Sequence, residues 1–246
     1  MIDLDALIAQ AQGVEPLPGT VLRLAGLIAG HDYDVDEVAE IVAFDQALTL
    51  KLLRAANSAS NMGVLAVTTA REAVARLGAA QILAFSVAAQ VGPLMQKRIP
   101  QYGLTEGKLW RHSVAAALAA EVAPKFMAVP VPPESFTAAL LHDIGKLVMA
   151  RFLNPEILAL LWEAKTAGGL NPLQAETELL RVHHGELGGL IAKHWKLPEN
   201  IVKGIQYHHT PEMGGEPICD VVHIANLAAK RVEAALARRN LKLWPN

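Results

Sequence analysis

The apolar residues of this chain recur every three or four positions along most of its length, a spacing typical of helices that bury one face. One stretch, 64–67, has the composition of a strand but is too short to found a sheet. The sequence therefore predicts an all-α protein, a helical bundle with two lobes. The predicted helices cover residues 4–11, 21–30, 34–44, 45–58, 69–78, 77–96, 109–123, 134–152, 155–168, 172–195, 198–210 and 217–239.

Local signals predict where several of these helices begin and end. Asp34 with Glu37, and Thr69 with Glu72, have the three-residue spacing of a capping box, in which the two side chains bond to free backbone N–H groups at the helix start. Gly30 follows a predicted helix, and we expect it to end that helix in the left-handed conformation.

The segment 93–107 interrupts the helical pattern, since it contains two prolines and two glycines. We expect the boundary between two lobes there. The N-terminal lobe, 1–103, is predicted to be a bundle of about five helices, and the C-terminal lobe, 104–246, a second bundle.

Composition and charge limit the classes of function. A chain of 246 residues can bury a full core without disulfides. Its 22 Lys and Arg balance 24 Asp and Glu, so nothing favours a nucleic-acid surface based on general basicity. Cys219 is the only cysteine, which is typical of a reducing compartment. The basic stretch KRVEAALARRN is expected to be a solvated helix face.

Two features raise the question of a membrane or a secretory signal. The run 77–96 is uncharged over 20 residues, which is long enough to span a bilayer. It contains Gln81 and Gln90 and lacks basic flanks, so a buried helix of a soluble protein is favoured. The first ten residues include Asp3 and Asp5 and no basic residue, which argues against a secretory signal. We expect a cytoplasmic protein that does not contact a membrane.

Histidines are concentrated late in the chain, since eight of the nine lie at or beyond His112. A mixed set of imidazoles and one carboxylate suits a borderline divalent ion such as Fe, Mn, Zn or Ni. The alternative is that these histidines are hydrogen-bonded core residues. His194 and His223 are expected to be of this second kind. By type and position the candidates for the metal site are His112, His142, Asp143, His183, His184, His208, His209 and His223, and of these His223 is the one for which the core role is favoured.

The geometry of a helix restricts how paired histidines can act. Neighbouring residues point about 100° apart, so His208 and His209 can share a site only near a helix end, or by facing two neighbouring ions. Pro211 disfavours helical geometry at the preceding residue and predicts such an end. His184 is favoured as the inward histidine of its pair, because Gly188 one turn later lets another helix approach.

Two sets of motifs resemble a known family. LLHDIGKLVM, with WRHS upstream and YHHTPE downstream, resembles the HD superfamily of metal-dependent phosphohydrolases. LPGTVLRL, FDQALTLKLLRAANSASNMG and TTAREAVARLGAAQILAFSVA resemble its HDOD subgroup. The resemblance covers about 14–240, so the chain is expected to be a single HDOD unit with an HDOD-specific lobe, 1–103, and an HD-like lobe, 104–246. It implies an all-helical bacterial protein linked to signalling.

The resemblance to HD phosphodiesterases of the HD-GYP type also implies a site for one or two divalent ions. Asp143 and Lys146 would be its catalytic residues, with Lys146 contacting a phosphate. Asn226 differs from that type, because it is neutral where a final carboxylate is expected, and Lys108 replaces an acidic ligand one turn before the first histidine. With one carboxylate, a two-ion site would be poorly balanced in charge. The implied ligands are His112, His142, Asp143, His184, His208 and His209.

Two functions agree with these features. The first is a signalling module with a metal-capable, partly degenerate HD site, which binds a signalling protein or a nucleotide-type ligand; Asn226 and the full N-terminal lobe favour it. The alternative is an active metal-dependent phosphohydrolase that cleaves a cyclic nucleotide or dinucleotide, which the retained histidines favour. We expect the N-terminal lobe to bind a partner between the helices that end at Asn57 and Gly78, rather than to serve only as scaffold. Nothing in the sequence indicates a DNA-binding motif.

Overall fold

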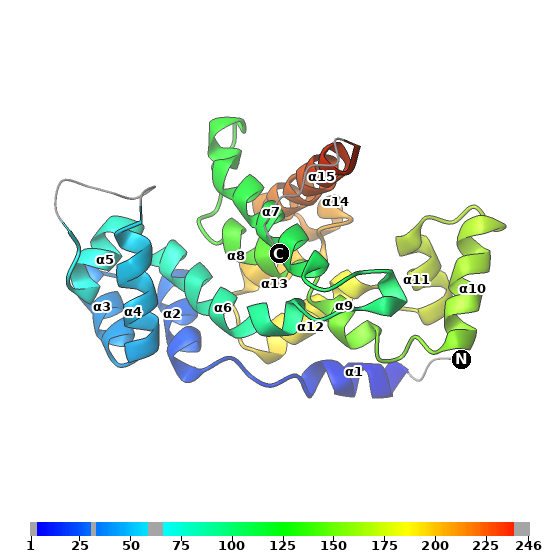
Figure 1. Ribbon diagram of the computed structural model, residues 1–246, viewed down its shortest axis with the longest axis horizontal. Helices are drawn as coiled ribbons and strands as arrows, with labels where there is room; N and C mark the ends of the chain where they lie inside the picture. Colours follow the sequence, from blue (N-terminus) through cyan, green and yellow to red (C-terminus); the bar gives the residue numbers. More distant parts are fainter. Residues whose placement is uncertain (1–3, 31–32, 59–65, 239–246) are drawn as a thin grey trace.

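The computed structural model describes residues 4–30, 33–58 and 66–238, and in these ranges the chain consists of helices joined by short connections (Figure 1). The described residues contain no strand, and their single β-bridge joins Ile99 to Leu104. The all-α prediction is therefore confirmed. Of the predicted strand 64–67, residues 64 and 65 lie outside the described part, and Val67 belongs to no strand.

Except for α1, the helices before residue 96 build one end of the molecule and reach its centre. α3, α4 and α5 pack on one another at the left of Figure 1, and α2 packs on α6, which extends toward the middle. The bounds of these helices are α1 Leu4–Gln12, α2 Gly19–Ala29, α3 Val35–Ala43, α4 Gln46–Ala56, α5 Ala70–Leu77 and α6 Ala79–Met95.

The ends of these helices follow the sequence signals at most positions. The capping boxes at Asp34 and Thr69 are both present, each closed by the glutamate three residues later. The predicted left-handed end at Gly30 is wrong, because α2 continues in right-handed geometry to this residue, whose φ is −69°. Gly78 forms a sharp corner between α5 and α6 with a φ of 80°, which favours glycine. The expected interruption begins only after Met95, since Pro93 lies within α6.

The corner at Gly78 also bears on whether the uncharged run 77–96 could span a membrane. In the described ranges, no single helix has both the length and the apolar character needed to cross a membrane. α5 and α6 reach that length only as a pair, and they are bent by 107° relative to each other. Ile82 and Leu83 of α6 are fully buried in the core of the protein.

The chain after Met95 includes two long helices that pack on each other. α7 and α15 run side by side, and α8 and α13 pack against α15 beneath them (Figure 1). α10 and α11 form the end of the molecule opposite α3–α5. The bounds are η2 Pro100–Tyr102, α7 Lys108–Val122, η3 Ala123–Lys125, α8 Ser135–Leu141, α9 Gly145–Met149, α10 Pro155–Thr166, α11 Pro172–Leu180, α12 His184–His194, α13 Glu199–Gln206, α14 Pro211–Gly214 and α15 Pro217–Arg238.

The first helix packs mainly on helices that lie far from it in the sequence. α1 runs along the lower edge of the molecule and packs on α12 and α9 (Figure 1). Leu7 is fully buried there, and the Trp195 indole N–H donates to the backbone oxygen of Glu15 at 3.0 Å. The N-terminal segment therefore contributes to the core of the half that carries the histidines.

The predicted helix 134–152 is interrupted. α8 ends one residue before His142 and α9 begins two residues after Asp143, and between them backbone N–H groups bond three rather than four residues back. Nδ1 of His142 lies 2.7 Å from the Ala139 carbonyl oxygen, which would accept from the Asp143 N–H in a continuous helix. This competing bond helps to end α8 at the histidine.

The predicted helix 172–195 is also divided in two. Arg181 ends α11 in the left-handed conformation, with a φ of 62°. His183 then begins α12 as a cap: its backbone N–H donates to Glu186, and its Nδ1 accepts from the Gly185 N–H at 3.1 Å. The periodicity of apolar residues continues across this break, which is why the pattern predicted a single helix.

Candidate metal centre

Six side chains form two groups of possible metal ligands in the middle of the second half. Each group contains three residues whose ligand atoms lie within 4.8 Å of one another. An ion with bonds of about 2.0–2.2 Å holds its ligands up to about 4.4 Å apart, so small shifts would close either group around an ion. The groups are His112–His142–Asp143 and His184–His208–His209.

Asp143 joins the two groups, because its two carboxylate oxygens face different histidines. Its Oδ2 lies 3.4 Å from Nε2 of His142 and 3.7 Å from Nε2 of His112. Its Oδ1 lies 3.2 Å from Nε2 of His184 and 4.0 Å from Nε2 of His208. One buried carboxylate therefore faces both groups, an arrangement that suits a bridge between two ions.

Two of the histidines are oriented by the carbonyl groups of the helices that precede them. Nδ1 of His142 lies 2.7 Å from the oxygen of Ala139, and Nδ1 of His208 lies 2.7 Å from that of Ile205. A carbonyl can only accept, so each Nδ1 carries the proton and donates it. Each Nε2 is then left with its lone pair directed toward Asp143, as a metal ligand requires.

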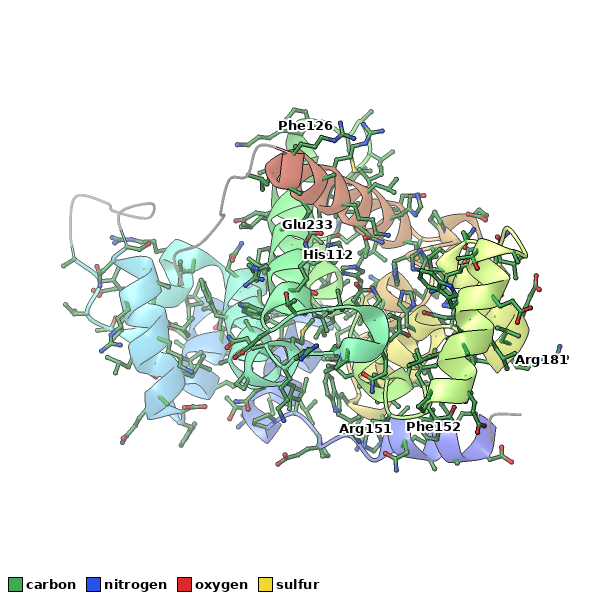
Figure 2. The ribbon with its side chains drawn as sticks, turned by 45° about the vertical axis from the view of Figure 1, so that its right-hand side comes forward. His112, Phe126, Arg151, Phe152, Arg181 and Glu233 are labelled. Carbon is green, nitrogen blue, oxygen red and sulfur yellow. The ribbon has the colours of Figure 1, made fainter. Side chains whose placement is uncertain are left out.

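Two further histidines are oriented by carboxylates. Nδ1 of His184 lies 2.7 Å from Oε2 of Glu176, and Nδ1 of His112 lies 3.4 Å from Oε1 of Glu233. Figure 2 shows His112 and Glu233 where α7 and α15 run side by side. Lys108 pairs with the other oxygen of Glu233 at 3.1 Å. Such carboxylate–histidine pairs set the tautomer of a metal-ligating ring and raise its basicity.

These carboxylates change the charge balance expected from the sequence. Asp143 is not the only negative group, because Glu176 and Glu233 each contact one of the histidines. The stretch 230–238 is mostly exposed, as expected of a solvated helix face, but its Glu233 is partly buried between Lys108 and His112. It places a carboxylate beside the position where Lys108 replaces an acidic residue.

Two buried nitrogen atoms indicate whether these residues fit a metal ion. Nε2 of His142 and Nε2 of His208 are buried and have no hydrogen-bond partner. A buried polar atom without a partner costs about 1–3 kcal/mol, so native structures rarely keep one without a reason. A metal ion would give both atoms a partner, and the residues therefore fit a divalent ion.

The protonation states agree with ligand roles. Burial disfavours the charged form of Asp143, but Lys146 and His142 outweigh it and hold its pKa well below the ordinary range. Burial lowers the pKa of His208 well below its usual value and that of His209 to about 2, so both rings stay neutral. For His184, burial and Lys146 lower the pKa, but Glu176 and Asp143 prevail and raise it.

Nε2 of His184 also lies 2.9 Å from Nε2 of His209. Without a metal, one of these nitrogens must carry a proton between them, and the raised pKa of His184 makes its ring the donor. A bound ion would take the place of that proton. Metal binding in this group is thus expected to release a proton from His184.

Two lysines lie close to the centre. Nζ of Lys146 is 2.6 Å from Oδ2 of Asp143. The charge of Lys230 on α15 contributes to lowering the pKa of His209, and burial lowers the pKa of Lys230 itself. An ion bound to Oδ2 must share this oxygen with Lys146 or displace it, which would leave the ammonium group available to an anionic ligand.

Three further histidines of the described residues, His183, His194 and His223, belong to neither group. His183 caps α12, so His184 is the inward member of that pair. His194 is exposed, and its predicted partial burial is wrong because it lies on the outer face at the end of α12. His223 is partly buried, and its Nδ1 lies 2.8 Å from the backbone oxygen of His208, as expected of a hydrogen-bonded core residue.

Asn226 is buried on α15, and its Oδ1 has no hydrogen-bond partner. It precedes Glu233 by seven residues, so both lie on one face of this helix. Sequence reasoning singled out Asn226 but missed Glu176, Glu233 and Tyr102, whose hydroxyl donates to Glu176 at 3.0 Å. No local spacing relates these three residues to the histidines that they support.

The HDOD domain family matches residues 14–211, which include all six candidate ligands. A protein of Shewanella amazonensis named as a candidate phosphohydrolase is 28% identical, with a TM-score of 0.68 over 93% of this chain and 81% of its own. An HDOD domain protein of unknown function from Geobacter sulfurreducens is 27% identical, with a TM-score of 0.67 over 99% of this chain and 82% of its own.

One sequence relative is considerably longer than this chain. It is an uncharacterized protein of Treponema pallidum, 27% identical over 226 residues. The match covers 88% of this chain, but the chain spans only 42% of that relative's length.

Proposed function

This chain belongs to the HDOD family, and we propose that it is a signalling module that holds one or two divalent metal ions between the groups His112–His142–Asp143 and His184–His208–His209. Fe, Mn, Zn and Ni are the ions that this mixture of imidazole and carboxylate suits. The two lobes proposed for it, 1–103 and 104–246, are the HDOD-specific part and the HD-like part.

One observation carries the proposal. Four histidines have their Nδ1 directed to an acceptor and their Nε2 directed to the two oxygens of a single buried aspartate. A hydrogen-bonded core needs no such convergence, and it would not leave two of these Nε2 atoms without partners.

The test is elemental analysis of protein purified without chelator. Asp143→Ala should abolish bound Fe, Mn, Zn or Ni, because both groups lose their shared carboxylate. Asp220→Ala is the matched control, since Asp220 is an exposed aspartate on α15 and should leave the metal content unchanged. Equal metal content in the wild type and Asp143→Ala would contradict the proposed site.

The second candidate function is hydrolysis of a phosphodiester, such as a cyclic nucleotide or dinucleotide. A bound ion would supply an activated water and offset the charge on phosphoryl oxygens. Asp143 would hold that ion, and Lys146 would contact the phosphate. The candidate phosphohydrolase of Shewanella amazonensis supports this function by its name and its 28% identity.

Asn226 separates the two candidates. A carboxylate at this position should help a two-ion arrangement by offsetting charge, so Asn226→Asp is expected to raise metal occupancy and turnover of a phosphodiester. Wild-type activity should be weak or absent in the same assay. Rapid hydrolysis by the wild type would favour the enzyme, and would show that the neutral residue at 226 does not limit it.

A signalling module needs a partner, and we propose that the N-terminal helices bind one. An apolar pocket of 700 Å³ lies beside α5, α6, α7 and α8, with Phe85, Trp110 and Leu118 among its lining residues. Of the segment that joins the helix ending at Asn57 to the helix ending at Gly78, residues 59–65 lie outside the described part. A nucleotide-type ligand remains the alternative occupant of the metal centre itself.

A further inference from the structure

Tyr102 lies in the connector between α6 and α7, outside the helices that carry the histidines. The connector holds it in a closed loop. Ile99 and Leu104 pair in both directions, with N···O distances of 2.9 and 3.1 Å, and Gly103 turns the chain with a φ of 65°. A short loop with paired ends leaves the tyrosine few alternative positions.

The hydroxyl of Tyr102 contacts the centre through Glu176. It donates to Oε1 of Glu176 at 3.0 Å. The other carboxylate oxygen, Oε2, lies 2.7 Å from Nδ1 of His184 and accepts from the His184 backbone N–H at 3.0 Å. Both oxygens of this buried carboxylate are therefore bonded, one to the connector and one to a candidate ligand.

The tyrosine remains a donor at neutral pH. Its burial and the charge of Glu176 raise the pKa of Tyr102 well above its ordinary range, so the hydroxyl keeps its proton. Removal of the hydroxyl would leave Oε1 of Glu176 buried without a partner. The carboxylate could then rotate to find another donor, and Oε2 would no longer be held against His184.

The ring of Tyr102 contacts the other side of the centre. Nζ of Lys146 lies 5.8 Å from the centroid of the ring, within the range of a cation–π contact. The same ammonium group lies 2.6 Å from Oδ2 of Asp143. Tyr102 thus contacts both Glu176, which bonds to His184, and Lys146, which pairs with Asp143.

We propose that Tyr102 is a positioning residue of the metal centre: through Glu176 it fixes the ring of His184, and so it tunes metal affinity in the group His184–His208–His209. The inference rests on the proposed metal-binding function. It makes the connector between the two proposed lobes part of the site, because a shift of η2 would move the hydrogen bond that orients a ligand.

The expected effects follow from the distance of each group from the ion. Loss of a partner that orients a ligand typically weakens metal binding by about 10–100-fold, and this is expected of Glu176→Gln. The Tyr102 hydroxyl contacts Glu176 and not the ligand itself, so Tyr102→Phe should weaken metal binding less, by about 3–10-fold. The variant keeps the aromatic ring, so the contact with Lys146 and the packing of the connector should remain.

The experiment is a titration of the metal-free full chain with Co²⁺, followed by the visible absorption of the bound ion. Wild type, Tyr102→Phe, Glu176→Gln and the double variant are compared, with Tyr33→Phe as a matched control that removes a hydroxyl from an exposed tyrosine far from the centre in sequence. Thermal midpoints of the metal-free proteins show whether each variant is folded. The absorption spectrum reports the ligand field, which a change in stability alone would not alter.

We expect Tyr102→Phe to bind Co²⁺ more weakly than the wild type and with a changed absorption spectrum. Tyr33→Phe should have the affinity and the spectrum of the wild type. The double variant should bind no more weakly than Glu176→Gln, because the hydroxyl acts through that carboxylate. Wild-type affinity and spectrum in folded Tyr102→Phe would overturn the inference, as would additive losses in the double variant. A wild-type chain that binds no Co²⁺ would instead overturn the proposed function, and this inference with it.

Discussion

At the scale of single residues, the histidines of the centre differ in how they respond to protons. Burial lowers the pKa values of His142, His208 and His209, whereas the pKa of His184 is raised despite burial, because Glu176 and Asp143 stabilise its charged ring. In the unfolded chain all four would titrate near their ordinary pKa of 6.5. The metal-free protein should therefore be sensitive to pH just below neutrality.

The sign of this effect follows from linkage. A histidine with a lowered folded pKa contributes stability that is complete above pH 6.5 and is lost as the pH falls, because the unfolded state then binds a proton that the folded state does not. His209, whose pKa is lowered to about 2, accounts for about 1.4 kcal/mol of this loss between pH 7.5 and pH 5.5. His184 acts in the opposite direction, since its raised pKa adds stability that is complete below its ordinary pKa.

We expect the free energy of unfolding of the metal-free protein to fall between pH 7.5 and pH 5.5, because the histidines with lowered pKa values outnumber His184; urea denaturation with a chelator present measures this. His209→Gln should reduce this pH dependence by about 1.4 kcal/mol. A wild-type urea midpoint that is the same at both pH values would contradict the assigned protonation states.

At the scale of the elements, the centre depends on where helices stop. His142 and His208 follow the ends of α8 and α13, and each ring bonds to a carbonyl three residues earlier. Carbonyl groups at a helix end lack intrahelical donors, and a histidine can supply one. The same bond that closes the helix also directs Nε2 toward Asp143, so the break in the helix and the orientation of the ligand have one cause.

α9 and α12 approach so closely that their backbones touch. A Cβ atom placed on Gly145 would lie 2.7 Å from the Gly188 nitrogen and still closer to the backbone oxygen of His184. Neither is a flexible side chain that could move aside. The approach brings the turn with Asp143 against the first residue of α12, and only glycine allows it.

Gly145→Ala should therefore separate α9 from α12 and draw Asp143 away from His184. We expect a loss of 1–3 kcal/mol or more in the free energy of unfolding, about the cost of overpacking a core, together with loss of bound metal. Gly26→Ala is the matched control, because a Cβ there meets no atom within 4 Å and the substitution favours the helix. Normal stability and metal content in Gly145→Ala would show that the two helices can separate without disturbing the centre.

At the scale of the whole molecule, the N-terminal helix packs in one half of the molecule and the helices that come directly after it build the other half. α1 packs under α12 and α9, although α2 to α5 lie at the opposite end from α10 and α11 (Figure 1). Leu7 of α1 is fully buried, as is Leu24 of α2, which belongs to the helices around α6. The half with the histidines is thus completed by the first residues of the other half.

This arrangement predicts which helices a core mutation will destabilise. Leu7→Ala and Leu24→Ala should each cost about 2–5 kcal/mol. Native-state hydrogen exchange should show that Leu7→Ala exposes the amides of α12, whereas Leu24→Ala should mainly affect α6 and its neighbours. Equal protection patterns in the two variants would mean that the whole chain opens as one unit.

Much of the local structure could be predicted from the sequence, because its causes are local. The capping boxes at Asp34 and Thr69 and the helical periodicity depend on residues three or four positions apart. The same holds for the helix end before His208, which Pro211 indicates. The candidate ligands could also be found in the sequence, because the alternation of apolar and polar positions in a helix does not account for a cluster of histidines with an adjacent aspartate.

Other features depended on the tertiary structure, because they join positions that no local pattern relates. Tyr102 and Glu176 are 74 residues apart, and Glu233 lies beyond the matched family segment, yet packing brings them against His184 and His112. A buried glutamate and a solvated one look alike in a helical sequence. Only the packing of α15 on α7, and of the connector on α11, determines which charged side chains are removed from water and must find partners there.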